Sequence, residues 1–229
     1  MADTRTIRFD PHVHTGASYD AEGSVHEVLN YCQNTQLDAV AITDHDTTVA
    51  AREAIQQQAR YEVTVVPGAE VSTADGHLLA LNVVDRPPVG QPFTETVDWI
   101  RDAGGIAVVP HPFQRSRHGI PKRAIDSCDG IEVFNAWSMI GIQNQRAASF
   151  ADDRGYPALG GSDAHRSGMI GQAYTEIEVA APPSELTADD IIAAIDAGET
   201  RAVGEPISKR RYLRKYVRAV RYRLANRAP

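Results

Sequence analysis

The sequence has few cysteines, few lysines and no long apolar run. Cys32 and Cys128 are the two cysteines among 229 residues, and neither belongs to a CxxC pair. This argues against a disulfide framework, and we expect two reduced, mostly buried thiols. No apolar run approaches the ~20 residues that a membrane-spanning helix needs. Residues 1–5 lead directly into a short apolar stretch rather than a signal peptide, which predicts a cytoplasmic protein.

Positive charge is also scarce over most of the chain. The sequence has 30 acidic and 23 basic residues, and only three of the basic residues are lysines. No acidic residue follows Glu205, so the body before that point holds 14 cations against 30 carboxylates, about −16, and the tail carries about +9. The nine tail cations are Lys209, Arg210, Arg211, Arg214, Lys215, Arg218, Arg221, Arg223 and Arg227.

The cationic tail also carries an apolar stripe. Leu213, Val217, Val220 and Leu224 follow one another at spacings of four, three and four residues, which favours an amphipathic helix. Such a helix could pack on the acidic body, bind the phosphates of a nucleic acid, or bind an anionic membrane surface. We favour packing on the body, because the cations would neutralise its carboxylates. We therefore divide the chain into a domain of residues 1–207 and a basic helix or tail of residues 208–229.

Short apolar segments alternate with helical patterns along the body. Strands are predicted over residues 7–12, 38–43, 62–68, 76–84, 106–110, 130–134, 156–161 and 173–179. Helices are predicted over residues 24–36, 94–103, 121–128, 142–154 and 187–197, and another follows the second strand and ends at residue 60. Ser24 and Glu27 are expected to form a capping box at the start of the first helix. Such units predict an α/β fold with a parallel sheet covered by helices, either doubly wound or closed into a barrel. No GxGxxG or GxxxxGK[ST] motif points to a dinucleotide or Walker-type site.

Six of the eight histidines lie at or beside the ends of predicted strands, and carboxylates share these places. The histidines are His12, His14, His45, His77, His111 and His165, and the carboxylates are Asp44, Asp46, Glu70 and Asp163. The C-terminal ends of parallel barrel strands converge on one face, so five chain segments would deliver these groups to a single mouth. His77 differs, because it comes from the start of its own strand.

Local spacing supports metal binding by these residues. In extended chain, His12-x-His14 places both imidazoles on the same side, and Asp163-x-His165 repeats that geometry. Asp44 precedes His45, where a carboxylate can orient an imidazole. A cysteine-free set rich in histidine suits Zn, Mn or Fe better than Ca or Mg alone, and the number of candidates predicts two or three ions.

Other polar residues near the strand ends are candidates for contact with a substrate. His118, Arg115 and Arg117 lie in the loop after the fifth predicted strand, where the arginines could clamp a phosphate and His118 could touch the substrate. A solvated basic loop is the alternative for this segment. Asn135 also follows a strand, and it could bind a substrate, hold a ligand or serve a turn.

In this order, the motifs resemble those of the PHP superfamily, named after polymerases and histidinol phosphatases. The matching stretches, which lie within residues 9–179, are Asp10-Pro11-His12-Val13-His14 with Asp20, Ile42-Thr43-Asp44-His45-Asp46, Gly68-Ala69-Glu70-Val71-Ser72 with His77-Leu78-Leu79-Ala80, Pro110-His111-Pro112, and Gly160-Gly161-Ser162-Asp163-Ala164-His165. The resemblance implies a distorted (β/α)7 TIM-like barrel with a trinuclear metal centre.

The resemblance also distributes the ligands among the ions. It implies that one ion is held by His12, His14, Glu70 and Asp163, that Glu70 bridges to a second ion held with His77 and His111, and that a third is held by Asp20, His45 and His165. Many family members have histidine where this chain has Asp20. That replacement resembles the branch of nucleotide phosphatases and RNA exonucleases.

Hydrolysis of a phosphoester is the activity that the resemblance implies. The substrate would be a phosphorylated small molecule or nucleotide, attacked by metal-activated water at a dinuclear or trinuclear centre. Asp44 and His118 are the candidate catalytic side chains. Two alternatives stay open: an exonuclease acting on RNA or DNA ends, which the cationic tail could assist, and a catalytically silent metal-binding regulatory module.

Overall fold

The computed structural model describes residues 4–138, 141–182 and 185–204. Both the predicted domain boundary at 207 and the predicted basic helix over 208–229 lie outside these ranges and stay predictions. The helices are α1 (Val25–Asn34), α2 (Val49–Gln57), α3 (Phe93–Asp102), α4 (Ile142–Arg154) and α5 (Ala188–Asp196). Single 3-10 turns cover Gln58–Arg60, Arg115–Arg117, Lys122–Ala124 and Ser167–Met169.

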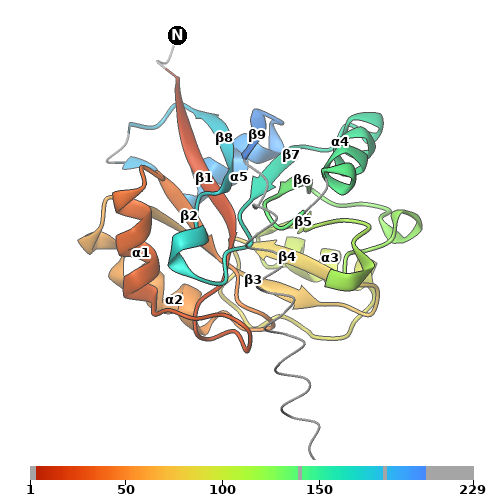
Figure 1. Ribbon diagram of the computed structural model, residues 1–229, viewed down its shortest axis with the longest axis horizontal. Helices are drawn as coiled ribbons and strands as arrows, with labels where there is room; N and C mark the ends of the chain where they lie inside the picture. Colours follow the sequence, from red (N-terminus) through yellow and green to blue (C-terminus); the bar gives the residue numbers. More distant parts are fainter. Residues whose placement is uncertain (1–3, 139–140, 183–184, 205–229) are drawn as a thin grey trace, which may run out of the picture.

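The strands form one nine-stranded sheet in the order β7-β6-β5-β4-β3-β2-β1-β8-β9. They are β1 (Arg5–Val13), β2 (Ala39–Ile42), β3 (Thr64–Ser72), β4 (His77–Leu81), β5 (Ile106–Val109), β6 (Gly130–Asn135), β7 (Ala158–Gly161), β8 (Ala173–Val179) and β9 (Thr200–Gly204). In Figure 1, α1 and α2 lie to the left of the strands and α4 lies to their upper right.

The sheet curls until its first and seventh strands meet. Beyond the end of β7, Ala164 forms a parallel bridge with Val13 of β1. In that bridge the backbone N–H of His14 donates to the carbonyl of Ala164 over 2.9 Å. Strands β1 to β7 therefore form a distorted barrel, and the β8–β9 hairpin extends the sheet past β1. This confirms the predicted α/β barrel class, with β9 as a strand that the sequence pattern did not reveal.

One strand of the barrel runs against the others. β4 pairs antiparallel with both β3 and β5, whereas β1–β2, β2–β3, β5–β6 and β6–β7 are parallel. The cause is the four-residue connection from Thr73 to Gly76, which is too short for a crossover and can only make a hairpin. Gly76 is required there: its φ is +141°, and a Cβ would come within 2.3 Å of the His118 carbonyl oxygen. The predicted parallel sheet is corrected at this strand and at β8, which pairs antiparallel with β1 and β9.

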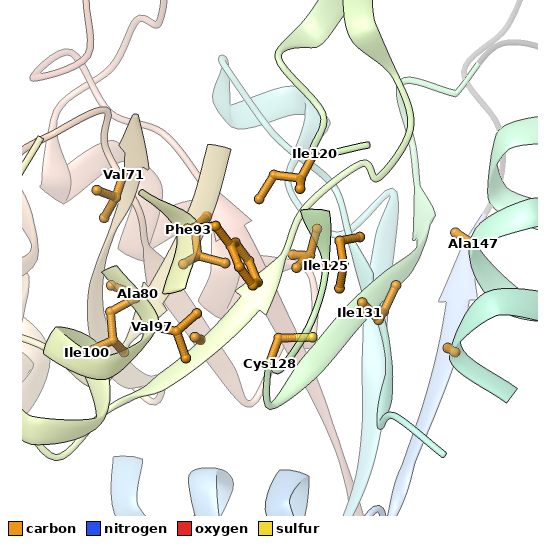
Figure 2. Close-up of a cluster of buried hydrophobic side chains, with 14 of the residues drawn as sticks. Val71, Ala80, Phe93, Val97, Ile100, Ile120, Ile125, Cys128, Ile131 and Ala147 are labelled. Carbon is orange, nitrogen blue, oxygen red and sulfur yellow. The ribbon is translucent and has the colours of Figure 1, made fainter. Parts of the chain in front are cut away.

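The apolar core lies on both surfaces of the sheet. Inside, Phe9, Ala41, Val66 and Leu79 from successive strands pack with Ile191 of α5. Outside, α3 and α4 cover a second cluster, drawn in Figure 2, in which Phe93, Val97 and Ile100 of α3 face Val71, Ala80 and Ile131 of the strands. The two cysteines are buried and free: Cys32 lies on the buried face of α1, and Cys128 lies in this second cluster.

The remaining elements follow local sequence signals closely. The Ser24–Glu27 capping box forms as predicted, and Thr187 with Asp190 forms a second one at the start of α5. The predicted helix over 121–128 shrinks to the 3-10 turn Lys122–Ala124. The chain becomes extended at Ile125, and its side chain, like that of Cys128, reaches the cluster in Figure 2. Burial of these two side chains thus overrides the helical pattern.

None of the helices in the described ranges combines the length and the apolar character that crossing a bilayer requires.

Candidate metal centre

The barrel gathers the nine predicted metal-binding residues at the C-terminal ends of its strands. β1 supplies His12 and, just past its end, His14. Glu70 lies in β3, and His45, His111, Asp163 and His165 follow β2, β5 and β7. His77 is the first residue of β4, which reaches the same end of the barrel because β4 runs in the opposite direction. Asp20 comes from the loop between β1 and α1.

Glu70 is the centre of this arrangement. Its carboxylate is buried and has five imidazoles around it. Its Oε2 lies 3.4 Å from His12 Nε2, 3.4 Å from His14 Nε2 and 3.2 Å from His45 Nδ1, and its Oε1 lies 2.9 Å from His77 Nδ1 and 2.9 Å from His111 Nε2.

Four ligand atoms approach one another in the way that a bound cation would require. The Nε2 atoms of His12 and His14 are 3.2 Å apart. Asp163 Oδ1 lies 3.7 Å from the first and 3.5 Å from the second, and Glu70 Oε2 lies 3.4 Å from each. Four ligands at about 2.0–2.1 Å from one ion in a tetrahedron would be about 3.4 Å apart. The five spacings around the two Nε2 atoms are close to that value.

The hydrogen bonds of the outer nitrogens of the two histidines direct their inner nitrogens into the cluster. His12 Nδ1 lies 3.1 Å from Glu132 Oε1, and a carboxylate can only accept, so Nδ1 carries the proton. The Ser18 hydroxyl donates to Asp44 over 2.6 Å, so at 3.2 Å it accepts from His14 Nδ1. Both Nε2 lone pairs therefore point into the cluster, and this donor set fits a divalent metal ion.

Two further groups of donors adjoin this set. His77, His111 and Glu70 Oε1 form one of them, at the distances given above. In the other, Asp20 Oδ2 lies 3.1 Å from His165 Nε2, and Asp20 Oδ1 lies 3.5 Å from His45 Nε2. Asp20 is the most exposed of the nine, so the cluster opens to solvent on its side. The Nδ1 atoms of His45 and His111 are buried without a hydrogen-bond partner among the described residues.

The pKa values reflect dense charge in a buried space. Burial lowers the pKa of His12, but Glu70 and Glu132 outweigh it and raise the pKa to about 9. Burial takes the pKa of His14 well below its ordinary value, and burial together with Arg117 lowers the pKa of His111 to about 4. The carboxylates thus favour a positive charge at His12, either a proton or a metal ion, while His14 and His111 favour the neutral form with a free lone pair.

The backbone is strained at the strand ends that carry this site. His111 has a φ of +29°, Asp163 of +51° and Asp46 of +57°, which is the left-handed region that residues other than glycine avoid. Each such residue costs about 1–3 kcal/mol, so the surrounding structure must hold it in place. The strain directs the side chains of His111 and Asp163 towards the cluster.

Two buried carboxylates that were not predicted as site residues hold the site together. Glu132 contacts His12 Nδ1 and accepts from the His111 N–H over 2.7 Å. Asp10 accepts from the N–H groups of Ser162 and Gly171, and burial raises its pKa to about 6 against these bonds. In the sequence, Glu132 could have been recognised as a single charged residue between apolar residues of a buried strand. Asp10 could have been recognised as a charged residue two positions before the first histidine of the cluster.

The predicted catalytic and substrate-binding residues take different positions. Asp44 is buried and accepts from Thr15 N–H, Thr15 Oγ1 and Ser18 Oγ over 2.6–2.8 Å, so it holds the loop after β1. His118 is exposed, and its ring lies 4.9 Å from that of His77. The structure therefore brings His118 to the rim of the site and keeps the Asp44 carboxylate beneath it.

The three residues predicted to contact a substrate also lie in different environments. Asn135 is buried, and its amide donates to Glu132 and Asp163 while its oxygen accepts from Arg117. Arg117 in addition forms an ion pair with Asp163 Oδ2. These two side chains therefore hold the Oδ2 atom of Asp163 in place. Arg115 is exposed and lines two neighbouring hollows of the surface.

The sequence of this chain is similar to those of known proteins. Residues 141–200 match the family described as PHP-associated. The chain is 31% identical over 152 residues to the uncharacterized protein MJ1587 of Methanocaldococcus jannaschii, covering 62% of this chain and 89% of that protein.

Solved structures share the fold at lower identity. A two-domain protein from Bacteroides vulgatus that contains a predicted PHP-like metal-dependent phosphoesterase superposes with a TM-score of 0.75, at 18% identity, covering 94% of this chain and 70% of that one. A lesion-specific endonuclease from Pyrococcus furiosus superposes with a TM-score of 0.63, at 15% identity, covering 86% of this chain and 58% of that one.

Proposed function

Because this chain belongs to the PHP superfamily, we propose that it is a metal-dependent phosphoesterase that hydrolyses a phosphorylated metabolite or nucleotide. The observation that carries the proposal is the convergence of four donor atoms: the Nε2 atoms of His12 and His14 lie 3.2 Å apart, and carboxylate oxygens of Glu70 and Asp163 lie 3.4–3.7 Å from both. Donors converge in this way to hold a cation, and the set lies at the end of the barrel where active sites form.

We assign the ligands to three ions. The first is held by His12, His14, Glu70 and Asp163, the second by Glu70, His77 and His111, and the third by Asp20, His45 and His165. Divalent Zn, Mn or Fe suits these nitrogen and oxygen donors, and when bound it supplies Lewis acidity that activates water and offsets the charge of the phosphate.

The remaining residues position these ligands and handle protons. Glu132 fixes His12 with its Nε2 lone pair directed inward, and Arg117 with Asn135 holds Asp163. Asp44 holds the turn after β1 through Thr15 and Ser18 and is a positioning residue in this proposal. His118, exposed beside His77, is the side chain placed to give a proton to the leaving alcohol.

The test combines elemental analysis with a substrate screen. The purified protein is expected to contain two to three divalent ions per chain and to hydrolyse at least one of a panel of mononucleotides, nucleoside bisphosphates, sugar phosphates, histidinol phosphate and short oligonucleotides. His26→Ala is the matched control for His12→Ala, because His26 lies on the exposed surface of α1.

Loss of metal and of activity in His12→Ala, with both retained in His26→Ala, supports the proposal. Full activity in thoroughly chelated protein contradicts it. Bound metal without turnover of any phosphoester would indicate a catalytically silent regulatory module instead.

A further inference from the structure

A basic groove lies next to the candidate metal centre. It is a hollow of about 830 Å³ between the loop that follows β5 and one face of α4. Positions 142, 145, 146, 149, 150 and 153 of α4 line it, at the spacing of a single helical face. Its cations are Arg115, Lys122, Arg123 and Arg146, and its apolar surface comes from Phe113, Pro121 and Ile142. Buried Phe150 lies beneath this surface, with Lys122 Nζ 5.3 Å from its ring centroid.

The charge of this groove is unusual for the chain. Up to residue 205 the sequence has 14 basic residues, and four of them line this one hollow. Asp153 is the one acidic residue among the lining residues. Within the described parts of the chain, none of the four cations forms an ion pair. The groove therefore presents unneutralised positive charge on an otherwise acidic body and is suited to a polyanion.

The groove is continuous with the candidate metal centre. A smaller hollow of about 370 Å³ lies between them, lined by His77 and His118 at one end. Arg115 and Pro121 line both hollows. A ligand with one phosphate at the metal centre could thus pass His118 and Arg115 into the groove. A phosphomonoester of a small metabolite would leave the groove's cations without a partner.

The apolar surface identifies the rest of the ligand. Half-buried Phe113 packs edge to face on buried Phe150, with ring centroids 5.5 Å apart, and half-buried Pro121 and exposed Ile142 lie on the same wall. Cations along a groove with aromatic and apolar side chains between them are typical of sites for single-stranded nucleic acid, where bases rest on apolar surface and phosphates meet the cations. A duplex would present its phosphates but would keep its base faces stacked.

We propose that the basic groove binds the nucleotides next to the terminal phosphoester of a single-stranded nucleic acid whose end lies at the candidate metal centre. The placement of the scissile phosphate rests on the proposed function, but binding in the groove does not depend on hydrolysis. The proposal narrows the substrate from phosphoesters in general to oligonucleotide ends.

The test measures binding of a 5′-phosphorylated hexathymidylate, labelled at its 3′ end, to the full-length chelated protein by fluorescence anisotropy. The groove variant is Arg123→Glu with Arg146→Glu. The matched control, Arg52→Glu with Arg86→Glu, makes the same change of charge at two exposed positions outside the groove. We expect at least a tenfold higher Kd for the groove variant and a salt dependence shallower by about 1.4, since each single-strand phosphate contact contributes about 0.7.

Several outcomes would overturn the proposal. Equal weakening in the two double variants would mean that the overall field, not the groove, attracts the probe. Binding unaffected in the groove variant but lost when residues 205–229 are removed would assign the interaction to the tail. An abasic hexamer is expected to bind at least fivefold more weakly, and equal binding would remove the role of the apolar wall.

Two further measurements test whether the groove binds a strand or a single nucleotide, and whether groove binding and hydrolysis can be separated. Thymidine 3′,5′-bisphosphate is expected to compete at least tenfold less well than the hexamer, and equal competition would limit the groove to one nucleotide and contradict a strand. If the hexamer binds through the groove but the metal-loaded protein hydrolyses no phosphoester, the proposed function fails while the groove assignment stands.

Discussion

The candidate metal centre and the basic groove lie side by side, yet their side chains are held in opposite ways. In the metal centre, His12, Glu70 and Asp163 are buried, and each contacts other fixed groups. In the groove, Arg123 and Arg146 are exposed, and neither has an ion pair among the described residues.

The difference follows from the ligands that the two regions suit. A small ion with fixed bond lengths needs donors placed to within a few tenths of an ångström, and burial with strained backbone provides this. A flexible polyanion can meet long cationic side chains in many arrangements, so rigid placement would gain little. Preorganisation is concentrated where the ligand is small and charged.

Removal of a central ligand should produce the largest effect. Asp163→Ala takes away one of four donors and leaves Arg117 without its carboxylate partner. Loss of several kcal/mol of transition-state stabilisation corresponds to a fall in kcat/KM of about a thousandfold or more, measured on the best substrate of the screen. The fold should survive, with an unchanged circular-dichroism spectrum, and a kcat/KM within tenfold of wild type would contradict the assignment.

Loss of a supporting carboxylate should have a smaller effect. Glu132→Gln keeps the size of the side chain but weakens its hold on His12 Nδ1 and the His111 N–H. We expect metal affinity to fall by about 10–100-fold, as for other residues that orient metal ligands. Competition with a fluorescent chelator measures this directly. Unchanged affinity would show that His12 needs no orienting partner.

Metal bound at the candidate metal centre should raise Tm more than hexathymidylate bound in the basic groove does. At a metal concentration about a hundredfold above Kd, binding adds about 2.7 kcal/mol, which raises Tm by about 5–10 °C for a chain of this size. Hexathymidylate at the same multiple of its own Kd is bounded by the same relation but should reach less, because ligands that also bind the unfolded chain stabilise less. Differential scanning fluorimetry of the two additions compares them, and an equal shift would contradict the contrast.

A change remote from both regions should cost stability alone. Ser24→Ala removes the hydroxyl that accepts from Glu27 N–H at the start of α1. The cost is about 1 kcal/mol in the free energy of unfolding, measured by urea denaturation. Metal content and hexamer binding should equal those of the wild type, and a change in either would couple α1 to the site.

The sequence predicted the residues of the cluster better than those that hold them in place. Strand ends with histidine and carboxylate at alternating spacing are local patterns, and the structure brings all nine residues together, whereas their role as metal ligands stays a prediction. Glu132 was not found because its role depends on facing His12, which lies 120 residues away in the chain. Asn135 was predicted as a candidate contact residue from its place at a strand end, but its four side-chain partners follow from packing that no local pattern records.

Tertiary packing also explains the differences in the fold. The reversed direction of β4 follows from the short turn before it, which is visible in the sequence. The alternation of strands and helices elsewhere in the chain predicts parallel strands and does not reveal this exception. β9 has no fully buried residue and no clear alternation, so its pairing with β8 decides its structure. The basic groove combines a loop and a helix that come together only through the barrel, so its cations could not be grouped beforehand.

The bridge between β1 and β7 has a consequence for the order of folding. It joins Val13 to Ala164, and next to it Asp10 accepts from the Ser162 N–H across 152 residues of chain. Such long-range contacts form late, because the loop they close is entropically costly until the intervening strands have paired. During translation, the first two histidines emerge long before Asp163 does. A nascent chain therefore cannot assemble the first ligand set until nearly the whole barrel has been synthesised, so full occupancy by metal would report a completed fold.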